Sequence, residues 1–506
     1  MTNSTAPATS SAADPRRWAI LIVIAVCQLM LVLDSSIVTI ALPQAQQELG
    51  ISDTDRQWIV TAYALAFGGL LLLGGRIADS AGRKHVFVIG LIGFALASAI
   101  GGLAPNAAIL FGARALQGAF AAIMAPAALS LLAVTFTNGK ERATAFSVYG
   151  GISGGGAALG LILGGVLTEF TSWRWCLLVN VPVALVTAIL AARLIKESRT
   201  PGRAHYDIPG AITVTLGLVA LVYGFSEAGN NGWAAVSTII PLAAAGILLL
   251  GFVIIESRTN NPLLPLRVVL ERNRAGAFIA GLLSAAGLYG MFLFLTYYLQ
   301  GNLRYSALQA GFAFLPFSVG IVIGAVITNR LLPRIGPRII MTAGMALAAL
   351  GLFYFTSVTP TDTYFTHVLP AEIIVSIGMG IVFVTVSSTA LLGVRDSDSG
   401  TASALVNTSQ QVGGSLGTAL LNTIAATATA GFAASHIAST DLSALHGYHI
   451  AFLAAGIILA AGALATLLLV NANTMTSSTN RTPGAPVDTA VKKSTGPTED
   501  EQIHPK

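Results

Sequence analysis

Long apolar runs alternate with short polar segments along almost the whole chain. Each run is long enough to cross the roughly 30 Å hydrocarbon core of a bilayer, which takes about 20 residues of helix. The predicted spans are 18–42, 58–80, 85–104, 107–136, 141–167, 176–194, 208–228, 235–256, 275–299, 307–329, 338–358, 366–392, 402–430 and 447–471. The pattern therefore predicts an all-α integral membrane protein with fourteen transmembrane helices.

Two of these runs contain polar residues at unusual places. The first carries Asp34, and at 25 residues it is too long for the apolar core of a signal peptide, so we expect it to remain as the first helix. The thirteenth is interrupted by the polar stretch 407–411.

Composition supports a membrane protein. Hydrophobic residues make up 54% of the 506 and charged residues only 10%, whereas soluble domains carry about 25% charged residues. Such a chain cannot cover a soluble surface with polar groups, which argues against a soluble enzyme, a nucleic-acid binder or a secreted disulfide-rich protein.

Basic residues divide the loops into two classes. With an even number of spans, both tails lie on the same side as the even-numbered loops. The odd-numbered loops hold only Arg56, Arg174 and Arg304, whereas the even-numbered loops, the adjoining helix ends and the tails hold twenty-three basic residues. Because basic residues accumulate on the cytoplasmic side, we expect a multi-pass protein of the cell membrane with both termini in the cytoplasm. The net charge of +5 then reflects topology and indicates no nucleic-acid partner.

The chain also contains a degenerate internal repeat. Arg76 and Arg330 are 254 residues apart, as are Gly82 and Gly336, and the same offset places spans 1–5 over spans 9–13. Spans 7 and 8 have no counterpart. This predicts two six-helix bundles in a pseudo-twofold repeat plus two inserted central helices, an arrangement of parallel repeats that transporters use.

Five segments follow from the spans and the repeat. They are a cytoplasmic N-terminal tail at 1–17, an N-terminal six-helix bundle at 18–194, a linker with two inserted transmembrane helices at 195–274, a C-terminal six-helix bundle at 275–471 and a disordered cytoplasmic tail at 472–506. The last segment is polar and cannot bury a core. We expect a monomer.

Motifs for other chemistries are not apparent. In the only Gly-Lys pair, Gly139-Lys140, the first glycine of a P-loop would fall on Val134. Transport would therefore use an ion gradient, with no cofactor. His436, His446 and His449 are expected in one outer loop, and without a cysteine or carboxylate cluster beside them we expect no metal site. No catalytic constellation indicates an enzyme.

Asp34 is the most informative residue. It lies about 12 Å from the outer end of the first span at 1.5 Å per residue, and a carboxylate inside a membrane indicates a functional site that can bind and release a proton. Arg114 in the fourth span reaches nearly the same depth from the opposite direction, and Gln117 shares its helix face. We predict that Asp34 and Arg114 pair; the alternative to a functional pair is a static structural one.

The loop after the second span carries Asp79, Gly82, Arg83 and Lys84. Asp79 and Arg83 are one helical turn apart and can form an ion pair, and Gly82 permits a sharp turn. Topological charge alone explains Arg83 and Lys84 but leaves Asp79 unexplained.

Span 5 is rich in glycine. Gly156, Gly160 and Gly164 form one face at a spacing of four residues, and Gly165 follows. Such faces allow two helix backbones to touch, so the stretch has either a packing role alone or a gating role as well.

Together these residues resemble the major facilitator superfamily, and within it the fourteen-helix drug:proton antiporters. The similarity extends over residues 15–471. It rests on the loop 75–84, on Arg114 with Gln117-Gly118, on Asp34 with Leu33 and Ala41-Leu42-Pro43, on Trp58 with Tyr63, and on Ser172-Trp173-Arg174-Trp175 followed by Asn180-Val181-Pro182.

The resemblance implies roles for the candidate residues. It places Asp34 and Arg114 in proton coupling, and the loop containing Asp79 to Lys84 in holding the two halves together on the cytoplasmic side. The glycines of span 5 match the antiporter motif, although Leu161 stands where the family usually has proline, which argues against a proline kink in this helix.

The function implied is a proton-coupled antiporter that exports hydrophobic small molecules, such as drugs or antibiotics, by rocking two bundles around a central cavity. A dedicated secondary transporter of one metabolite, such as an amino acid, sugar or siderophore, is the alternative; a membrane sensor or enzyme is more remote. The polar residues expected near the substrate cavity are Gln117, Glu372, Asn407 and Gln411.

Overall fold

The chain is helical throughout the residues that its structure describes. This computed structural model describes residues 16–199, 207–259, 262–264, 266–394, 398–435 and 440–471, and within them no strand is present. These residues contain fourteen helical segments long and apolar enough to cross a membrane, which confirms the predicted number.

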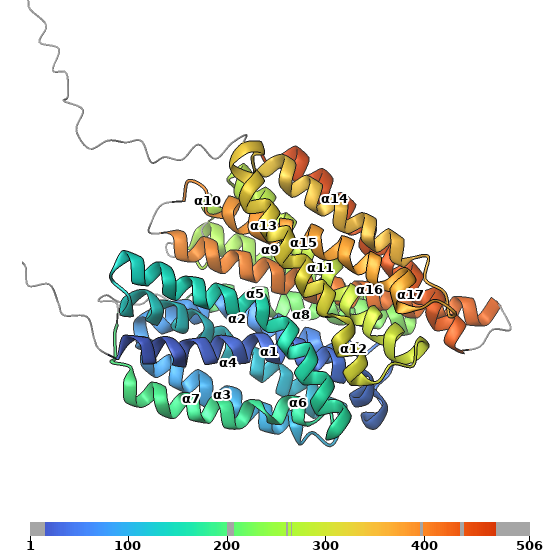
Figure 1. Ribbon diagram of the computed structural model, residues 1–506, viewed down its shortest axis with the longest axis horizontal. Coiled ribbons are helices and arrows are strands. Elements are labelled where there is room, and N and C mark those ends of the chain that lie inside the picture. Colours follow the sequence, from blue (N-terminus) through green and yellow to red (C-terminus); the bar gives the residue numbers. More distant parts are fainter. Residues whose placement is uncertain are drawn as a thin grey trace, which may run out of the picture.

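The first six membrane-crossing segments form one group of helices, here called the N-bundle (Figure 1). Its helices are α1 (Arg17–Leu49), α2 (Trp58–Ala81), α3 (Arg83–Gly102), α4 (Ala107–Thr135), α5 (Gly139–Phe170), α6 (Trp175–Leu178) and α7 (Asn180–Leu194).

The last six segments form the C-bundle, which the short helix α10 (Leu266–Val269) precedes. Its helices are α11 (Arg272–Tyr297), the π-helix η1 (Tyr298–Asn302), α12 (Ala307–Ala313), α13 (Leu315–Ile335), α14 (Pro337–Phe355), the π-helix η2 (Tyr364–Val368), α15 (Leu369–Ala390), α16 (Ser399–Ser435) and α17 (Thr440–Leu469).

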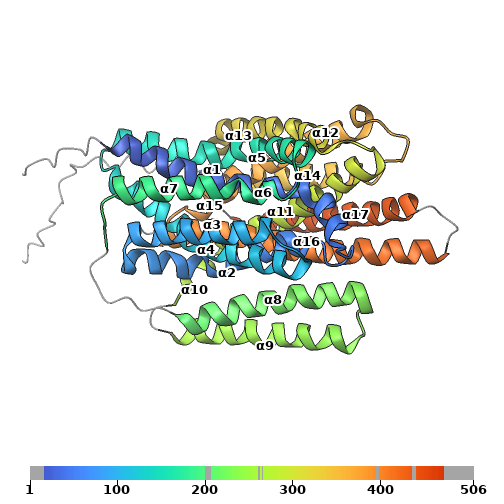
Figure 2. The same ribbon diagram turned by 90° about the horizontal axis from the view of Figure 1, so that it is seen from below.

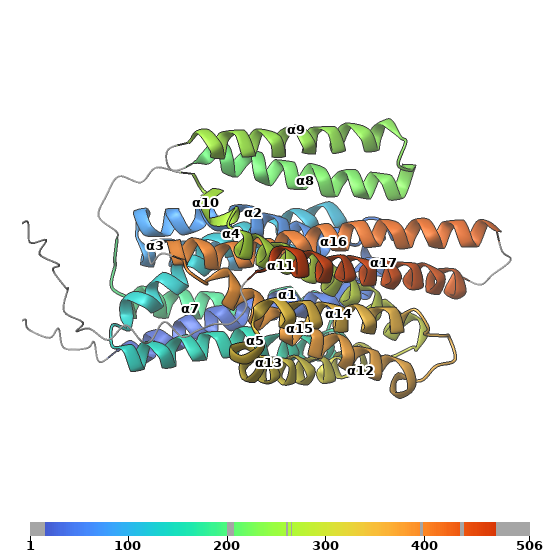
Figure 3. The same ribbon diagram turned by 90° about the horizontal axis from the view of Figure 1, so that it is seen from above.

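The two inserted helices, α8 (Ile208–Asn231) and α9 (Val236–Arg258), form a hairpin along one side of the molecule (Figures 2 and 3). Helix α8 bridges the bundles, since Leu218 and Val222 share an apolar cluster with Leu65 of α2 and Ala419 of α16. Helix α9 packs mainly on α8, and its outer face leaves Ile247 72% exposed. Such a face is suited to lipid.

The helices run roughly parallel, so the molecule has two ends (Figure 2). At the basic end, α1 begins beside α5 through the ion pair of Arg17 with Glu141 at 2.7 Å, and α17 ends beside α11, where the Asn471 amide donates to Asn273. The opposite end, where α1 ends and α2 begins, is here called the far end.

Several spans differ in detail from the prediction. The tenth is split at Phe314 into α12 and α13, because Pro316 in the first turn of α13 cannot donate an amide to the preceding turn. The thirteenth is one continuous helix, α16, in spite of its polar stretch, and there Asn407 and Ser409 donate to carbonyls of the preceding turn, those of Ser403 and Val406.

The outer loop predicted for the three histidines is wrong for two of them. Helix α17 begins at Thr440, so His446 and His449 lie in a helix; His436 lies outside the described residues. Gly447 of this helix packs closely against the backbone of Ala425 in α16. The His446 ring stacks on Phe432, His449 bonds to the carbonyl of Val358, and the described residues contain no group of three metal-ligating side chains.

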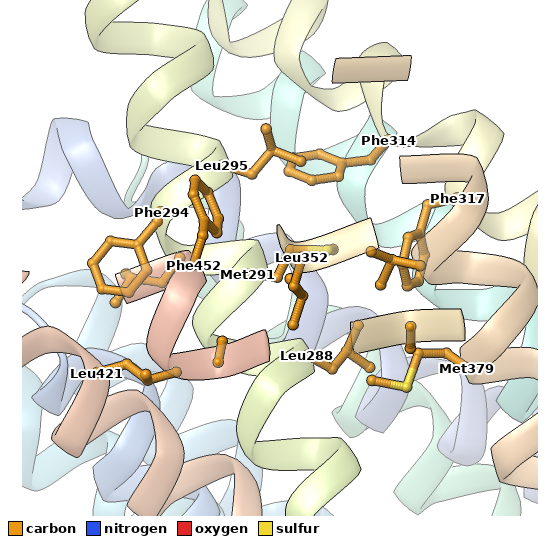
Figure 4. Packing of buried hydrophobic residues seen from close by; sticks show 14 of the residues in the cluster. Leu288, Met291, Phe294, Leu295, Phe314, Phe317, Leu352, Met379, Leu421 and Phe452 are labelled. Atoms are coloured by element: carbon orange, nitrogen blue, oxygen red, sulfur yellow. The ribbon is translucent and has the colours of Figure 1, made fainter. Parts of the chain in front are cut away.

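Close packing of apolar side chains holds much of each bundle together. In the C-bundle, large side chains such as Met291, Phe294, Phe317 and Phe452 interlock in the interior (Figure 4). Lipid tails are as apolar as these side chains, so the association of the helices depends on how closely their surfaces fit. A misfit of a single methyl group between two backbones should therefore be costly.

Gly74 and Gly75 of α2 provide a matched test of this fit. A methyl group on Gly74 would overlap the carbonyl of Ala122 in α4, whereas one on Gly75 would meet only the side chain of Pro126 at an ordinary 3.6 Å. We expect Gly74→Ala to destabilise the protein by about 1–3 kcal/mol and Gly75→Ala to be close to neutral. Thermal unfolding of the purified variants in detergent measures the difference, and equal melting temperatures would contradict the packing described here.

Candidate proton-coupling and transport site

A buried carboxylate lies at the centre of the N-bundle. Asp34 of α1 is 0% exposed and Arg114 of α4 is 1% exposed. The Arg114 Nη1 atom lies 2.7 Å from Asp34 Oδ2, so the predicted pair is present. The sequence predicts this pair from the depth of each residue in its span. The structure agrees, because α1 and α4 run in opposite directions and bring Asp34 and Arg114 to the same depth.

Two amides complete the environment of the carboxylate. Asn180 Nδ2 of α7 donates to Asp34 Oδ1 at 2.8 Å, and Gln117 Nε2 donates to the same oxygen at 3.1 Å. Asp34 thus accepts bonds from Arg114, Gln117 and Asn180, and each of these groups is a donor. This set of partners suits a carboxylate that carries its negative charge.

Arg114 is itself fixed from three directions. Its Nε donates to the Ile59 carbonyl at 2.9 Å, its Nη1 also donates to Gln117 Oε1 at 2.9 Å, and its guanidinium lies 4.6 Å from the centre of the Tyr63 ring. Gln117 donates in turn to Ser98 of α3 at 2.7 Å. Five helices therefore contribute to one network around Asp34.

Sequence reasoning identified Asp34, Arg114 and Gln117 as site residues but not Asn180 or Ser98. Asn180 was noticed only as part of a family motif, although an amide at the start of α7 is a signal that could have been followed. Ser98 gives no signal in the sequence, since a lone serine in an apolar helix most often bonds to its own backbone.

The glycines of α5 pack against the helix that carries Asp34. Gly156 contacts Val32, Gly160 contacts Ser36 and Gly164 contacts Ile37, all on α1. A methyl group on Gly164 would come within 2.7 Å of the Ile37 carbonyl. The close packing expected of this face is present, and its gating role stays a prediction.

Gly165 is used differently from the other three. It faces the C-bundle, where a methyl group would come within 2.8 Å of the Ala307 carbonyl in α12. In the same interface, Gly311 of α12 lies against the backbone of Leu161. Helix α5 contains no proline, so it contacts α1 and α12 as one uninterrupted helix.

The loop between α2 and α3 is a tight turn at the basic end. Gly82 has φ 110°, which favours glycine, and its counterpart in the repeat, Gly336, has φ 85°. Asp79 Oδ1 accepts bonds from Arg83 Nη2 at 2.8 Å and Nε at 3.1 Å, so this predicted contact is also present. Whether the loop controls the opening of this end stays a prediction.

Glu197, which follows α7, binds this loop and was missed by sequence reasoning. Its carboxylate accepts from the backbone amides of Lys84 at 3.2 Å and His85 at 3.1 Å, at the start of α3. Partial burial opposes ionisation of Glu197, but the amides of Ser198, His85 and Lys84 outweigh it and hold the pKa of Glu197 below its usual value. The anion is thus well placed at a helix N-terminus.

Polar contacts join the two bundles at the far end. Arg56, which precedes α2, donates to Asn422 of α16 at 3.1 Å and lies 4.0 Å from the centre of the Tyr297 ring in α11. Asn422 donates to the carbonyl of Asp53 at 2.8 Å, and Gln300 donates to the carbonyl of Ile40 at 3.1 Å. With the α5–α12 contact, these bonds join the two bundles at the far end.

The predicted cavity residues occupy different surroundings. Gln117 is buried in the Asp34 network, and Glu372 is 0% exposed inside the C-bundle. Asn407 is exposed, and Gln411 accepts a bond from the Tyr289 hydroxyl at 3.1 Å beside Gly68 of α2. The polar side chains of Asn407 and Gln411 on α16 are thus at least partly exposed. Their contact with substrate stays a prediction.

Two helical bundles that cross a membrane, one of them with a buried ion pair, define a membrane transporter. A family model of the Major Facilitator Superfamily matches residues 24–418, and the chain belongs to this superfamily. The predicted family is confirmed.

Its relatives include export and resistance proteins. The chain is 48% identical to the puromycin resistance protein of Streptomyces alboniger, over 94% of this chain and 96% of that protein. It is 40% identical to the cephamycin export protein of Amycolatopsis lactamdurans, over 79% and 84% of the two chains. It is 31% identical to a multidrug efflux pump of Mycolicibacterium smegmatis, over 81% of each chain.

Solved structures share the fold. A bacterial homologue of the human lysosomal transporter Spinster, in an inward-facing and unoccupied conformation, matches with a TM-score of 0.63 at 15% identity, over 90% of this chain and 98% of that one. An auto-inhibited peptide transporter of the POT family matches with a TM-score of 0.65 at 16% identity, over 89% and 96%.

The Asp34 network predicts that arginine is required at position 114. Arg114→Ala leaves a buried charge unpaired, at a cost of about 3–5 kcal/mol, and should abolish transport. Arg114→Lys keeps the charge but lacks the fork that reaches Asp34, Gln117 and Ile59 together, so it should recover little. Transport by inside-out vesicles measures both variants, with Arg304→Lys at an exposed ion pair as the control; full activity of Arg114→Ala would contradict the network's importance.

Proposed function

We propose that the protein is a proton-coupled antiporter of the cell membrane that exports hydrophobic small molecules from the cytoplasm. The observation that carries the proposal is the buried Asp34, held inside a membrane span by groups from four other helices. The names of its relatives, which are export, resistance and efflux proteins, support export of antibiotics or other drugs.

A proton on Asp34 would be incompatible with the observed hydrogen bonds. Arg114, Gln117 and Asn180 all donate to the two carboxylate oxygens. A protonated carboxyl must itself donate, so at least one of these bonds has to break or reverse. Proton binding therefore changes how α1 is held against α4 and α7.

This change can reach the other bundle through α5. Helix α1 packs on the glycine face of α5, and α5 contacts α12 of the C-bundle at Gly165 and Leu161. Because α5 presents no side chains at these glycines and meets backbone atoms of Ile37 and Ala307, it leaves little room to absorb a shift of α1. The chain α1–α5–α12 thus connects the charge of Asp34 to the closure of the far end.

The distribution of basic residues supports a cytoplasmic position for the basic end. The far end then faces outward and is closed by the contacts around Arg56 and α12. Contacts at the outward end suit a transporter of alternating access that receives substrate from the cytoplasm. Proton binding from outside and substrate release there would follow once the far-end contacts separate.

A dedicated exporter of one compound remains the second candidate, because the relatives include proteins named for a single antibiotic. A drug-susceptibility panel in a pump-deficient bacterial host distinguishes the two. Resistance to chemically unrelated compounds supports a multidrug pump, and resistance to one compound class supports the dedicated exporter.

Asp34→Asn tests the proposed coupling. Asn is close in shape but cannot carry a proton, so the variant should reach the membrane and lose export driven by a proton gradient. The measurement is substrate uptake by inside-out vesicles at an imposed pH gradient, with Glu227→Gln at the end of α8 as the control. Wild-type export by Asp34→Asn against a substrate gradient would rule out Asp34 as the coupling residue.

Substrate charge provides a second test. A dication would compete with Arg114 and the proton for Asp34 and leave one charge unpaired at low dielectric, at a cost of several kcal/mol. Neutral and singly charged amphipathic compounds avoid that cost and can bond to Asn407 and Gln411. We expect efflux of a lipophilic monocation and little efflux of a matched permanent dication; equal or faster efflux of the dication would overturn this expectation and indicate that another acid, such as Glu372, reaches the cavity.

A further inference from the structure

Glu372 is a buried acid for which the transport cycle described above has no use. It lies in the first turn of α15, near the far end of the C-bundle, and it is 0% exposed. Its Oε2 lies 3.1 Å from the hydroxyl of Tyr364 in η2, and the backbone amide of Phe317, in the first turn of α13, is its other polar neighbour among the described residues. Unlike Asp34, it is not in an ion pair with any described residue.

The hydroxyl of Tyr364 indicates which form of Glu372 is buried. This hydroxyl also lies 2.7 Å from the carbonyl oxygen of Ala313, which can only accept. A tyrosine has one proton to donate, and the shorter contact takes it. The contact with Glu372 is then a hydrogen bond only if the carboxyl carries a proton and donates it to the tyrosine.

The surroundings favour the same form. On η2 and its preceding loop the titratable groups are Tyr364, His367 and Asp362, the last two being paired at 3.2 Å. Tyr305 lies beside Tyr364 and Tyr354 stacks on His367. The remaining titratable residues on the helices around α15 are either tyrosines of α11 or arginines at the basic end: Tyr289, Tyr297, Arg272, Arg274, Arg330, Arg334 and Arg338. No cation among the described residues is therefore placed to compensate an ionised Glu372, and burial of the bare charge would be unfavourable.

The Glu372–Tyr364 pair is connected to the closure of the far end. Ala313, which accepts from Tyr364, is the last residue of α12. Helix α12 is the part of the C-bundle that contacts α5, through Ala307 beside Gly165 and through Gly311 beside Leu161. We expect the separation of α12 from α5 to withdraw the carbonyl that orients Tyr364 and to admit water to Glu372.

We propose that Glu372 is a second proton-binding site, which must bind a proton from the far side before the far end can close. The proposal rests on the proposed antiport cycle and deepens it. In the open state a hydrated Glu372 can ionise, and closure then requires that the proton return. In this proposal Asp34, which lies in a network of charged and polar groups, couples the proton to transport. Glu372, which has no cation beside it among the described residues, controls closure of the far end.

The site would control a step without transporting a proton. Glu372 lies near the far end, and its surroundings in the described residues connect it through Tyr364 to α12, which faces that end, and through the backbone amide of Phe317 to α13. Its proton would leave toward the side from which it came. The far end should consequently be closed at low pH and should open more often as the pH rises and the carboxyl ionises.

The experiment measures closure directly, on the full chain in lipid nanodiscs. Spin labels at Thr171→Cys after α5 and Thr361→Cys before η2, both exposed at the far end, report the distance between the bundles, and the native cysteines are buried. In the wild type we expect the long-distance population to grow as the pH rises. Glu372→Gln mimics the neutral acid and should keep the short distance over the whole pH range, whereas Asp441→Asn, at an exposed far-end ion pair, should behave as the wild type.

A second measurement keeps the proposal testable if Glu372→Gln folds poorly. In the Asp34→Asn background, infrared spectra at neutral pH should show the carbonyl band of a protonated carboxylic acid, and Tyr364→Phe should shift it and move the opening to lower pH. A Glu372→Gln variant with the pH dependence of the wild type, or the lack of such a band, would overturn the proposal. Failure of the antiport function is distinguishable, because it would appear as wild-type export by Asp34→Asn, a result that neither measurement at Glu372 affects.

Discussion

The N-bundle depends on the interactions that stabilise the carboxylate of Asp34 inside a membrane span. Burial of Asp34 is tolerated because a guanidinium and two amides donate to it, and because the guanidinium is fixed by a carbonyl and an aromatic ring. These donors come from helices that are distant in sequence, so the N-bundle must assemble around the charge. Any event that neutralises Asp34 removes the reason for this arrangement, which makes the ion pair a natural point of control.

Close backbone packing turns this local event into a movement of helices. Because these positions on α5 are glycines, no side chain of α5 separates its backbone from α1 and α12. In a membrane no hydrophobic driving force favours one helix contact over another, and the fit of the surfaces decides. Contacts of this kind have few intermediate positions, so a bundle interface built from them suits two discrete conformations.

The two acids of the interior show that depth alone does not determine chemistry. Asp34 is surrounded by donors that include a guanidinium, whereas Glu372 meets one hydroxyl, one backbone amide and no cation among the described residues. The far end joins them, because α12 contacts α5 on one side and orients Tyr364 on the other. In the proposed cycle, closure of this interface therefore depends on the protonation of both carboxyls.

The sequence by itself determined the properties that follow from a linear pattern. Apolar runs gave the fourteen spans, the spacing of Arg76 and Arg330 gave the repeat, and the rise per residue placed Asp34 level with Arg114. Only the tertiary structure decided which faces meet: that Asn180 completes the network, that α12 breaks from α13, that His446 lies in a helix, and that Glu372 points into the C-bundle. The reason is that depth in a membrane is a one-dimensional property of the chain, whereas the rotation and neighbours of each helix result from the packing of all the others.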